Sequence, residues 1–252
     1  MASINGNSPA IDKTKTASST CNSNSDSVYV ANYAIVKNQY VEFDEFVYDV
    51  NSRYMTTITK DKLFNASSVL DIVPEDANWT NIPFETVSIT VLNGNDEVRE
   101  IGDKKELNEA QIKLLKSTDY STDFYIKARG RNLRTEAGMM EDYVYYVTIV
   151  PEKEAEYIGG HDAFIAYLQE NSKELIKNLE KNLLHPGKVE FTITKEGAIR
   201  EIKLISSSGY LTIDSKMIEL IKNAPGKWKP AENSEGEKVN QKLVFSYGIM
   251  GC

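Results

Sequence analysis

An alternating segment in the last third of the chain restricts the fold more than any other feature. In KVEFTIT, residues 188–194, Val189, Phe191 and Ile193 alternate with charged or polar residues, and AIREIKLI, residues 198–205, repeats the pattern. Apolar residues with a period of two line one face of a half-buried strand. The short Lys-Glu-Gly segment between the two runs is a tight turn, so this part of the chain predicts a β-hairpin with one buried face.

Two helical patterns and a last strand accompany the hairpin. Residues 161–182 carry an apolar stripe, with Ser172 as a candidate cap that restarts and bends this helix. A second helix is expected at residues 215–224 with Asp214 as its N-cap, and KLVFSYGI, residues 242–249, is the expected final strand. Three antiparallel strands with two helices on one face are the simplest arrangement that buries these stripes. The sequence therefore predicts an α+β fold for this region.

The preceding part of the chain is richer in strands. Residues 1–27 hold mostly Ser, Asn, Thr and Lys with few large apolar residues, which predicts a disordered leader. β-branched and aromatic residues then recur, and the Asn-Gly that follows ETVSITVL predicts a hairpin. One helix is expected at residues 107–117, with Asn108 as its N-cap. We therefore predict a β-rich domain with one short helix over residues 28–151, followed by a second domain over residues 152–252.

Trp228 stands in a hydrophilic connector, GKWKPAENSEGEKVNQ. It is either a core plug that reaches inward from a loop or the marker of a binding surface. Because a buried Trp is far commoner than an exposed recognition Trp in a lone loop, we interpret Trp228 as a core anchor. Pro230 then stiffens the chain before the last strand.

Charge and composition exclude several classes of protein. The net charge is −8 and no basic patch or stripe is visible in the sequence, so nucleic acid is not expected as a partner. No run of about eighteen apolar residues is present, which excludes a transmembrane helix, and the first residues lack the features of a signal peptide. We expect any targeting segment or membrane anchor to be absent from this chain.

No catalytic or metal-binding pattern is visible. His161 and His185 have no partner carboxylate, Ser or Cys at motif spacing, and Cys21 and Cys252 have no second ligand nearby. The two cysteines are either free thiols or joined in a disulfide. We predict no catalytic residues, no metal and no cofactor. The alternative is an enzyme or ligand-binding site in residues 28–151, which a cleft with convergent polar groups would reveal.

A series of short motifs runs through residues 156–248. They are Gly159-Gly160, Gly187 with Val189, Lys195 with Gly197, Ser207-Ser208-Gly209, Asp214, and Trp228 with Pro230-Ala231. Each is weak alone, and together, in this order and spacing, they are fairly specific. With them, residues 156–248 resemble the TonB C-terminal domain family, especially the form common in Bacteroidetes-type envelope proteins.

The resemblance implies a non-enzymatic protein-binding function in the periplasm or cell envelope of a Gram-negative bacterium. TonB-like domains bind a short extended segment of outer-membrane transporters by adding it as a strand to an exposed sheet edge. Here the resemblance implies that the terminal strand forms this edge, with Leu243, Val244, Phe245, Ser246, Tyr247, Gly248 and Ile249. The expected partner is such a transporter segment or another envelope protein.

Two alternatives to this interpretation stay open at the level of sequence. The terminal strand could pair inside its own sheet or with a second copy of the chain in a homodimer, because exposed edges are often blocked. TonB-like domains also stand at the C-termini of envelope receptors that resemble β-lactam-sensing membrane metallopeptidases, so the resemblance also allows that this chain is the exported sensor portion of such a receptor.

Overall fold

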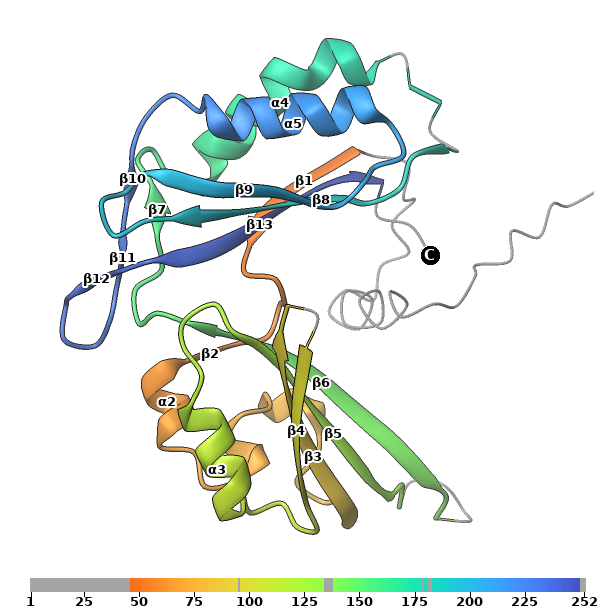
Figure 1. Ribbon diagram of the computed structural model, residues 1–252. Coiled ribbons are helices and arrows are strands. Elements are labelled where there is room, and N and C mark those ends of the chain that lie inside the picture. The colour runs from red at the N-terminus through yellow and green to blue at the C-terminus, as the bar shows by residue number, and fades with distance from the viewer. Residues whose placement is uncertain (1–45, 95, 134–137, 178, 181–182, 250–252) are drawn as a thin grey trace, which may run out of the picture. The chain divides into compact units, whose positions relative to one another are not determined.

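The computed structural model describes residues 46–249, except for 95, 134–137, 178 and 181–182. Within them the chain forms two main β-sheets, each with its own helices and its own hydrophobic core (Figure 1). The fold is α+β, as predicted. The predicted leader, the strands expected between residues 28 and 45, Cys21 and Cys252 lie outside the described residues.

The first sheet has five strands. Their order across the sheet is β2 (Thr57–Thr59), β6 (Met140–Val150), β5 (Asp123–Arg131), β3 (Phe84–Asn93) and β4 (Asp96–Gly102). All neighbours are antiparallel except β2 and β6, which run parallel. The predicted hairpin joins β3 to β4, and Gly94 takes a φ of +66° in its turn, a conformation that costs glycine little.

Short helices cover one face of this sheet (Figure 1). They are α2 (Lys60–Phe64) and α3 (Glu109–Lys116), with single 3-10 turns at Val69–Asp71 and Glu75–Ala77. α3 begins as predicted: Gln111 N donates to Asn108 Oδ1 at 2.9 Å, and Asn108 N donates to Gln111 Oε1 at 3.1 Å. α2 was not predicted, because five residues are too few for a helical period to be visible.

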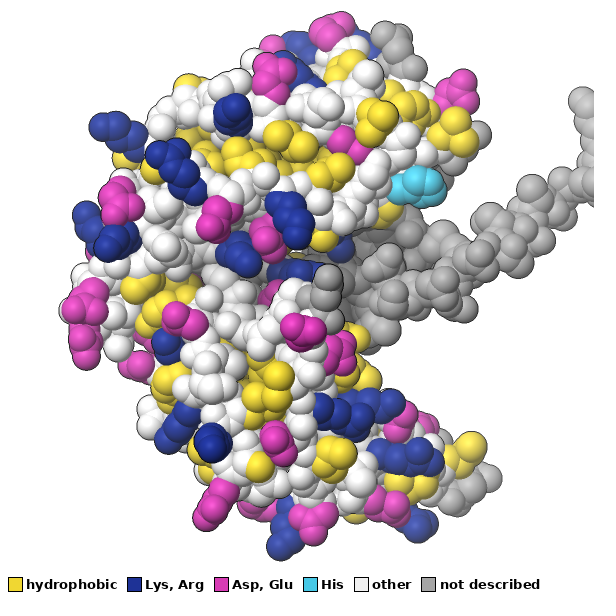
Figure 2. All heavy atoms as spheres, in the orientation of Figure 1, with side chains coloured by type: hydrophobic (Ala, Val, Ile, Leu, Met, Phe, Trp, Pro, Cys, Tyr) yellow, Lys and Arg dark blue, Asp and Glu magenta, His cyan; other side chains and the backbone are white. Residues whose placement is uncertain are grey.

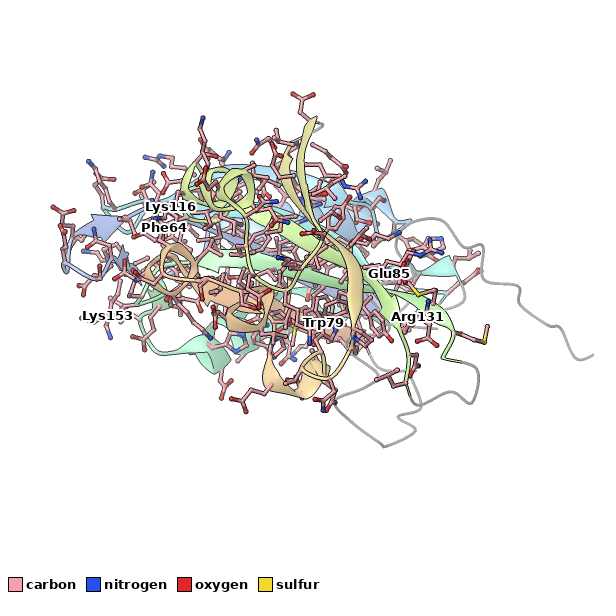
Figure 3. All side chains as sticks on the ribbon, turned by 90° about the horizontal axis from the view of Figure 1, so that it is seen from below. Phe64, Trp79, Glu85, Lys116, Arg131 and Lys153 are labelled. Carbon is pink, nitrogen blue, oxygen red and sulfur yellow. The ribbon has the colours of Figure 1, made fainter. Side chains whose placement is uncertain are left out.

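The core of the first sheet lies between its strands and these helices. The strand residues that fill it are fully buried and include Val87, Ile89, Phe124, Ile126, Val147 and Ile149. Trp79 is 3% exposed and makes edge-on contacts with Phe84, Tyr143 and Tyr145. Figure 3 shows Trp79 toward the end of the sheet that carries Glu85 and Arg131. The two tyrosines on β6 therefore serve sheet packing, as their position in a strand predicts.

The second sheet has four antiparallel strands in the order β1 (Phe46–Asn51), β13 (Gln241–Ile249), β8 (Gly187–Ile193) and β9 (Ile199–Ser206). α4 (His161–Ile176) and α5 (Leu211–Lys222) lie together over one face (Figure 1). Two small ladders complete this part of the chain: β7 (Glu156–Tyr157) with β10 (Trp228–Lys229), and β11 (Ala231–Glu232) with β12 (Lys238–Val239). The three predicted strands and two predicted helices are all present.

β1 is the strand that the sequence analysis assigned elsewhere. The β-rich domain predicted over residues 28–151 includes this strand, whereas β1 pairs with β13 over six residues, from Phe46 opposite Ile249 to Asn51 opposite Val244. Alternating apolar residues show that one face of a strand is buried, but they carry no information about the partner strand. A local sequence pattern therefore cannot predict that two strands far apart in the chain, such as β1 and β13, pair with each other.

Both helices of this region differ from expectation at one residue. α4 runs without a break through Ser172, whose Oγ donates to the carbonyl of Leu168 at 2.7 Å instead of capping a new helix. α5 begins at Leu211, so Asp214 lies within its first turn and is not the N-cap. The early start is hard to read from the sequence because Leu211 is 79% exposed and adds nothing to the apolar stripe.

Candidate functional site

The candidate site is β13, the strand to which the sequence analysis assigned partner binding. β13 pairs with β8 along Gln241–Tyr247 and with β1 along Val244–Ile249. The expectation that residues 243–249 form the edge of the sheet is therefore corrected, since β13 lies inside the sheet. The physical reason is that β1 supplies the main-chain hydrogen bonds that an added strand would otherwise make.

β1 places alternate side chains under α4. Phe46 and Tyr48 pack against the core in part, and Val50 is 5% exposed. Tyr48 Oη lies 2.6 Å from Ser172 Oγ, and the Tyr48 ring stacks on Phe245 of β13 with centroids 6.2 Å apart. The strand that pairs with β13 on this side therefore packs every second side chain against the core of the second sheet.

The two outer strands of this sheet differ in regularity. β9 pairs with β8 through two register shifts, and Glu201 within it takes a φ of +52°. Such bulges interrupt the regular row of donors and acceptors that a further strand needs. β1 pairs with β13 without a register shift. Among the described strands, the β1 side is therefore the regular side of the sheet.

A buried polar network holds the C-terminal end of β13. The carboxylate of Asp214 is 2% exposed and accepts hydrogen bonds from Tyr247 Oη at 2.7 Å, Ser208 Oγ at 2.7 Å, Ser208 N at 2.9 Å and Ser207 Oγ at 2.5 Å. Burial raises the pKa of Asp214, but these hydrogen bonds outweigh it and leave the pKa below its usual value. Burial, together with the bond to Asp214, raises the pKa of Tyr247. The network joins the segment that follows β9 to α5 and to β13.

Two glycines allow this packing. Gly187 opens β8 beneath the Tyr247 ring, and a Cβ at this position would lie 2.5 Å from ring carbons. Gly248 has a φ of +113°, and a Cβ there would lie 2.6 Å from the carbonyl oxygen of His185. The glycine of the G-x-V motif at the start of β8 therefore leaves room for the Tyr247 ring, whose hydroxyl group binds Asp214.

Trp228 lies in the core. It is 8% exposed, and its ring contacts Tyr157, Phe164 and Phe191 with centroids 5.2 to 6.0 Å apart. Gly197, with a φ of +77°, turns the β8–β9 hairpin against the Trp228 carbonyl. The side chain that the sequence marked for either packing or binding is used for packing.

The remaining motif residues also lie at structural positions. Gly159 and Gly160 take φ values of +110° and +88° directly before α4, Gly209 takes +89° beside His185, and Pro230 separates β10 from β11. None of these residues lies in β13 or β1. They shape the domain that carries the candidate site.

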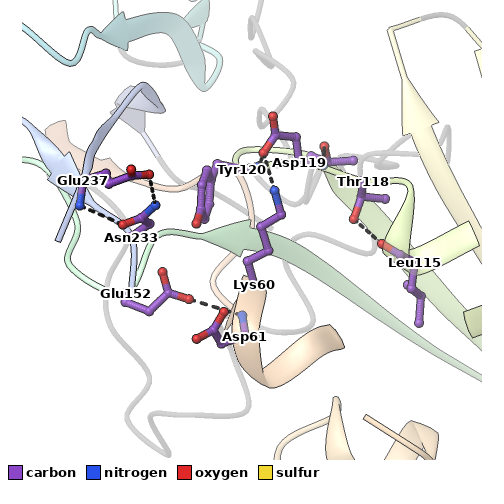
Figure 4. A network of polar contacts seen from close by, with 10 residues as sticks. Lys60, Asp61, Leu115, Thr118, Asp119, Tyr120, Glu152, Asn233 and Glu237 are labelled. Carbon is purple, nitrogen blue, oxygen red and sulfur yellow. Dashed lines mark hydrogen bonds and ion pairs between the residues drawn. The ribbon is translucent and has the colours of Figure 1, made fainter. Parts of the chain in front are cut away.

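No catalytic arrangement is apparent in the part of the chain that the structure describes. No group of three or more His, Cys, Asp or Glu there could hold a metal ion. His161 sits half-exposed at the start of α4, 3.5 Å from Asp162. The polar network around Lys60 in Figure 4 consists of an ion pair to Asp119 at 2.7 Å and of capping bonds such as Thr118 Oγ1 to Leu115 O. These contacts stabilise the first sheet's helices.

Within the described residues no helix is both long and apolar enough to cross a membrane.

Comparison with known proteins assigns one part of the chain. Residues 187–249 match the family model described as the Gram-negative bacterial TonB protein C-terminal. Neither the curated proteins nor the solved structures contain a match. The matched range spans β8, β9, α5 and β13, whereas β1 and α4 lie before it. The C-terminal part of this chain, residues 187–249, is therefore similar to the TonB C-terminal family.

Proposed function

We propose that this protein binds an extended segment of an outer-membrane partner protein in the cell envelope, by pairing that segment with β13. The TonB C-terminal family is a non-enzymatic domain for energy transduction and protein interaction. Strand addition draws its affinity from main-chain hydrogen bonds and its specificity from alternate side chains. The partner in this proposal is the periplasmic segment of an outer-membrane transporter, and the binding residues are Leu243 to Ile249.

One observation carries the proposal: β13 already holds a short strand from outside the matched domain. β1 contributes six residues, all in antiparallel register with β13, and lies before the matched range. A partner segment of similar length would satisfy the same backbone donors and acceptors on β13. The exchange of one strand for another then changes few hydrogen bonds overall, which keeps its free-energy cost small.

The side chains of β1 indicate what the partner segment should look like. Phe46, Tyr48 and Val50 face the core and alternate with Val47, Asp49 and Asn51 on the other face. A segment that takes the place of β1 therefore needs apolar residues at every second position, with aromatic residues at two of them. A segment with charged residues at these positions would bury an unpaired charge and bind poorly.

β1 has an advantage over any partner because it belongs to the same chain. A tethered strand has an effective concentration on the order of millimolar at its site. The partner's apparent affinity is reduced by the fraction of molecules in which β1 is bound. Weak binding by the intact chain and tighter binding after β1 is loosened are both expected.

The proposal is tested by NMR titration of the isotope-labelled full chain with peptides from the periplasmic N-terminal segments of outer-membrane transporters. Dose-dependent shifts concentrated at Leu243–Ile249 and at β1 are the expected result. A scrambled peptide of the same composition is the control, because strand addition requires the alternating pattern. Shifts confined to other elements, or none with ~1 mM peptide, would overturn binding at β13.

A further inference from the structure

The face of the first sheet that is turned away from α2 and α3 carries a cluster of cations. Successive residues of a strand point to opposite faces, so the strands that bury Val87 and Ile126 in the core direct their neighbours to the other side of the sheet. These neighbours include Thr86 and Ser88 of β3, Arg99 of β4, Lys127 and Arg129 of β5, and Asp142 of β6. Figure 2 shows Lys and Arg side chains gathered over these strands.

The pairing register brings these six residues together. Ser88 lies opposite Lys127, Thr86 opposite Arg129, and Arg129 opposite Asp142. Arg99 reaches the same place from β4, with Nη2 3.2 Å from Ser88 Oγ. Together they line a hollow of about 220 Å³ on the sheet surface. The hollow is built from four strands, so its shape is fixed by the sheet.

The charges around the hollow do not balance. Lys127 Nζ pairs with Asp142 Oδ2 at 2.8 Å, whereas Arg99 donates, among the described side chains, to the neutral hydroxyl of Ser88. Arg129 makes no ion pair or side-chain hydrogen bond to the described residues. The hydrogen bonds and charge of Lys127, and the charge of Arg129, lower the pKa of the Asp142 carboxyl. Among the residues that line the hollow, three cations therefore face a single carboxylate, that of Asp142.

This cluster is not visible as a basic patch or stripe in the sequence, because its members come from separate strands. Lys127 and Arg129 are separated by Ala128, which points into the core, and Arg99 is far away in the sequence. The net charge of the chain is −8, so the local excess of positive charge runs against the composition. Such a concentration of cations attracts anions to this face.

We propose that this hollow is an anion site that binds a phosphate group carried by a polar molecule. Guanidinium groups match phosphate oxygens with paired N–H donors, and the ammonium of Lys127 adds a third positive charge. Thr86 and Ser88 place hydroxyl groups beside the same hollow. The shared chemistry is the phosphate group, which a soluble phosphate compound and a lipid headgroup both supply. The hollow lies outside residues 187–249, and the proposal for it does not rest on partner binding at β13.

The chain offers a matched control for this proposal. Arg131 lies on β5 two residues beyond Arg129 and on the same face, but it pairs with Glu85 at 3.7 Å and does not line the hollow. Arg99→Gln and Arg129→Gln each remove one guanidinium that lines the hollow. Arg131→Gln removes an equal charge from the same face. All three side chains are exposed, so each variant is expected to fold, and far-UV circular dichroism checks this.

The test measures binding of inorganic phosphate and pyrophosphate to the full chain by calorimetry. In parallel, co-sedimentation is measured with vesicles of phosphatidylcholine alone and with vesicles that contain phosphatidic acid. Arg99→Gln and Arg129→Gln are expected to weaken binding about tenfold or more, and Arg131→Gln less than about twofold. Binding of the soluble anions identifies a soluble ligand, and binding only to phosphatidic acid vesicles identifies a headgroup. Equal losses in all three variants, or binding to neither form at ~10 mM phosphate, overturn the site.

Discussion

Tyr247 on β13 donates a hydrogen bond from Oη to Oδ1 of Asp214 on α5, at 2.7 Å, with the tyrosine 0% and the aspartate 2% exposed. The bond joins the last strand of the chain to the first turn of a helix across the core. It belongs to the network that also contains Ser207 and Ser208. A charged acceptor that is buried in this way makes each of its donors important.

Removal of the hydroxyl group of Tyr247 should destabilise the C-terminal domain. Tyr247→Phe keeps the ring but leaves the buried carboxylate with one donor fewer, so we expect a loss of about 1.5–3 kcal/mol in the free energy of unfolding. Urea denaturation followed by fluorescence measures it, in a Trp79→Phe background so that Trp228 alone reports. Tyr210→Phe is the control, since Tyr210 Oη donates to Glu180 O in an exposed bond at 3.0 Å. Equal losses for both variants would contradict the role of the network.

Acid should weaken the same network. The pKa of Asp214 is lowered in the folded state, because the hydrogen bonds from its neighbours outweigh its burial. The ionised carboxylate therefore stabilises the fold fully above its unfolded pKa of about 3.8, and this contribution is lost as pH falls through the lower folded value. We expect the stability difference between wild type and Asp214→Asn to be constant above about pH 5 and to shrink as the pH falls from there to about 2. A difference that stays constant over this range would show that the charge of Asp214 is unimportant.

Gly187 should tolerate no side chain while Tyr247 is present. In Gly187→Ala the new Cβ would lie 2.5 Å from the tyrosine ring, and we expect a loss of about 1–3 kcal/mol from overpacking. The double variant Gly187→Ala/Tyr247→Leu makes room for the methyl group. Its loss should therefore be smaller than the sum of the two single losses, which a double-mutant cycle of urea denaturations measures. If the loss of the double variant equals the sum of the two single losses, the strain in Gly187→Ala does not come from contact with the Tyr247 ring.

The sequence predicted those parts of the fold that depend on local pattern. The alternation in KVEFTIT and the cap at Asn108 each involve residues close in the chain, and both elements are present where expected. The same reasoning could not reveal that β1 pairs with β13, because the alternation of apolar residues shows which face of a strand is buried but not which strand lies next to it. It also could not assemble Arg99 with Lys127, since that requires the register of three strands. Long-range pairing decides both candidate sites.

Loosening of β1 should expose β13 and strengthen partner binding. Val50 is 5% exposed in the core beside Phe245, so Val50→Asp buries an unpaired charge and favours the release of β1. We expect the dissociation constant of a transporter peptide with the full-length variant to fall about tenfold, because the competition from the tethered strand is reduced. NMR titration measures it, and amide exchange along Val244–Ile249 should quicken in the absence of peptide.

Two further variants make this prediction specific. Val47→Thr lies on the same strand but on the opposite face, so it should leave the peptide affinity within about twofold of wild type. Tyr48→Phe removes only the contact between Tyr48 Oη and Ser172 Oγ at 2.6 Å, and it should give an intermediate gain because β1 is weakened without a buried charge. The fluorescence of Trp228 shows that the core of the C-terminal domain persists in each variant. If folded Val50→Asp binds the peptide no more tightly than Val47→Thr, β1 does not compete for β13, and the partner must use another surface.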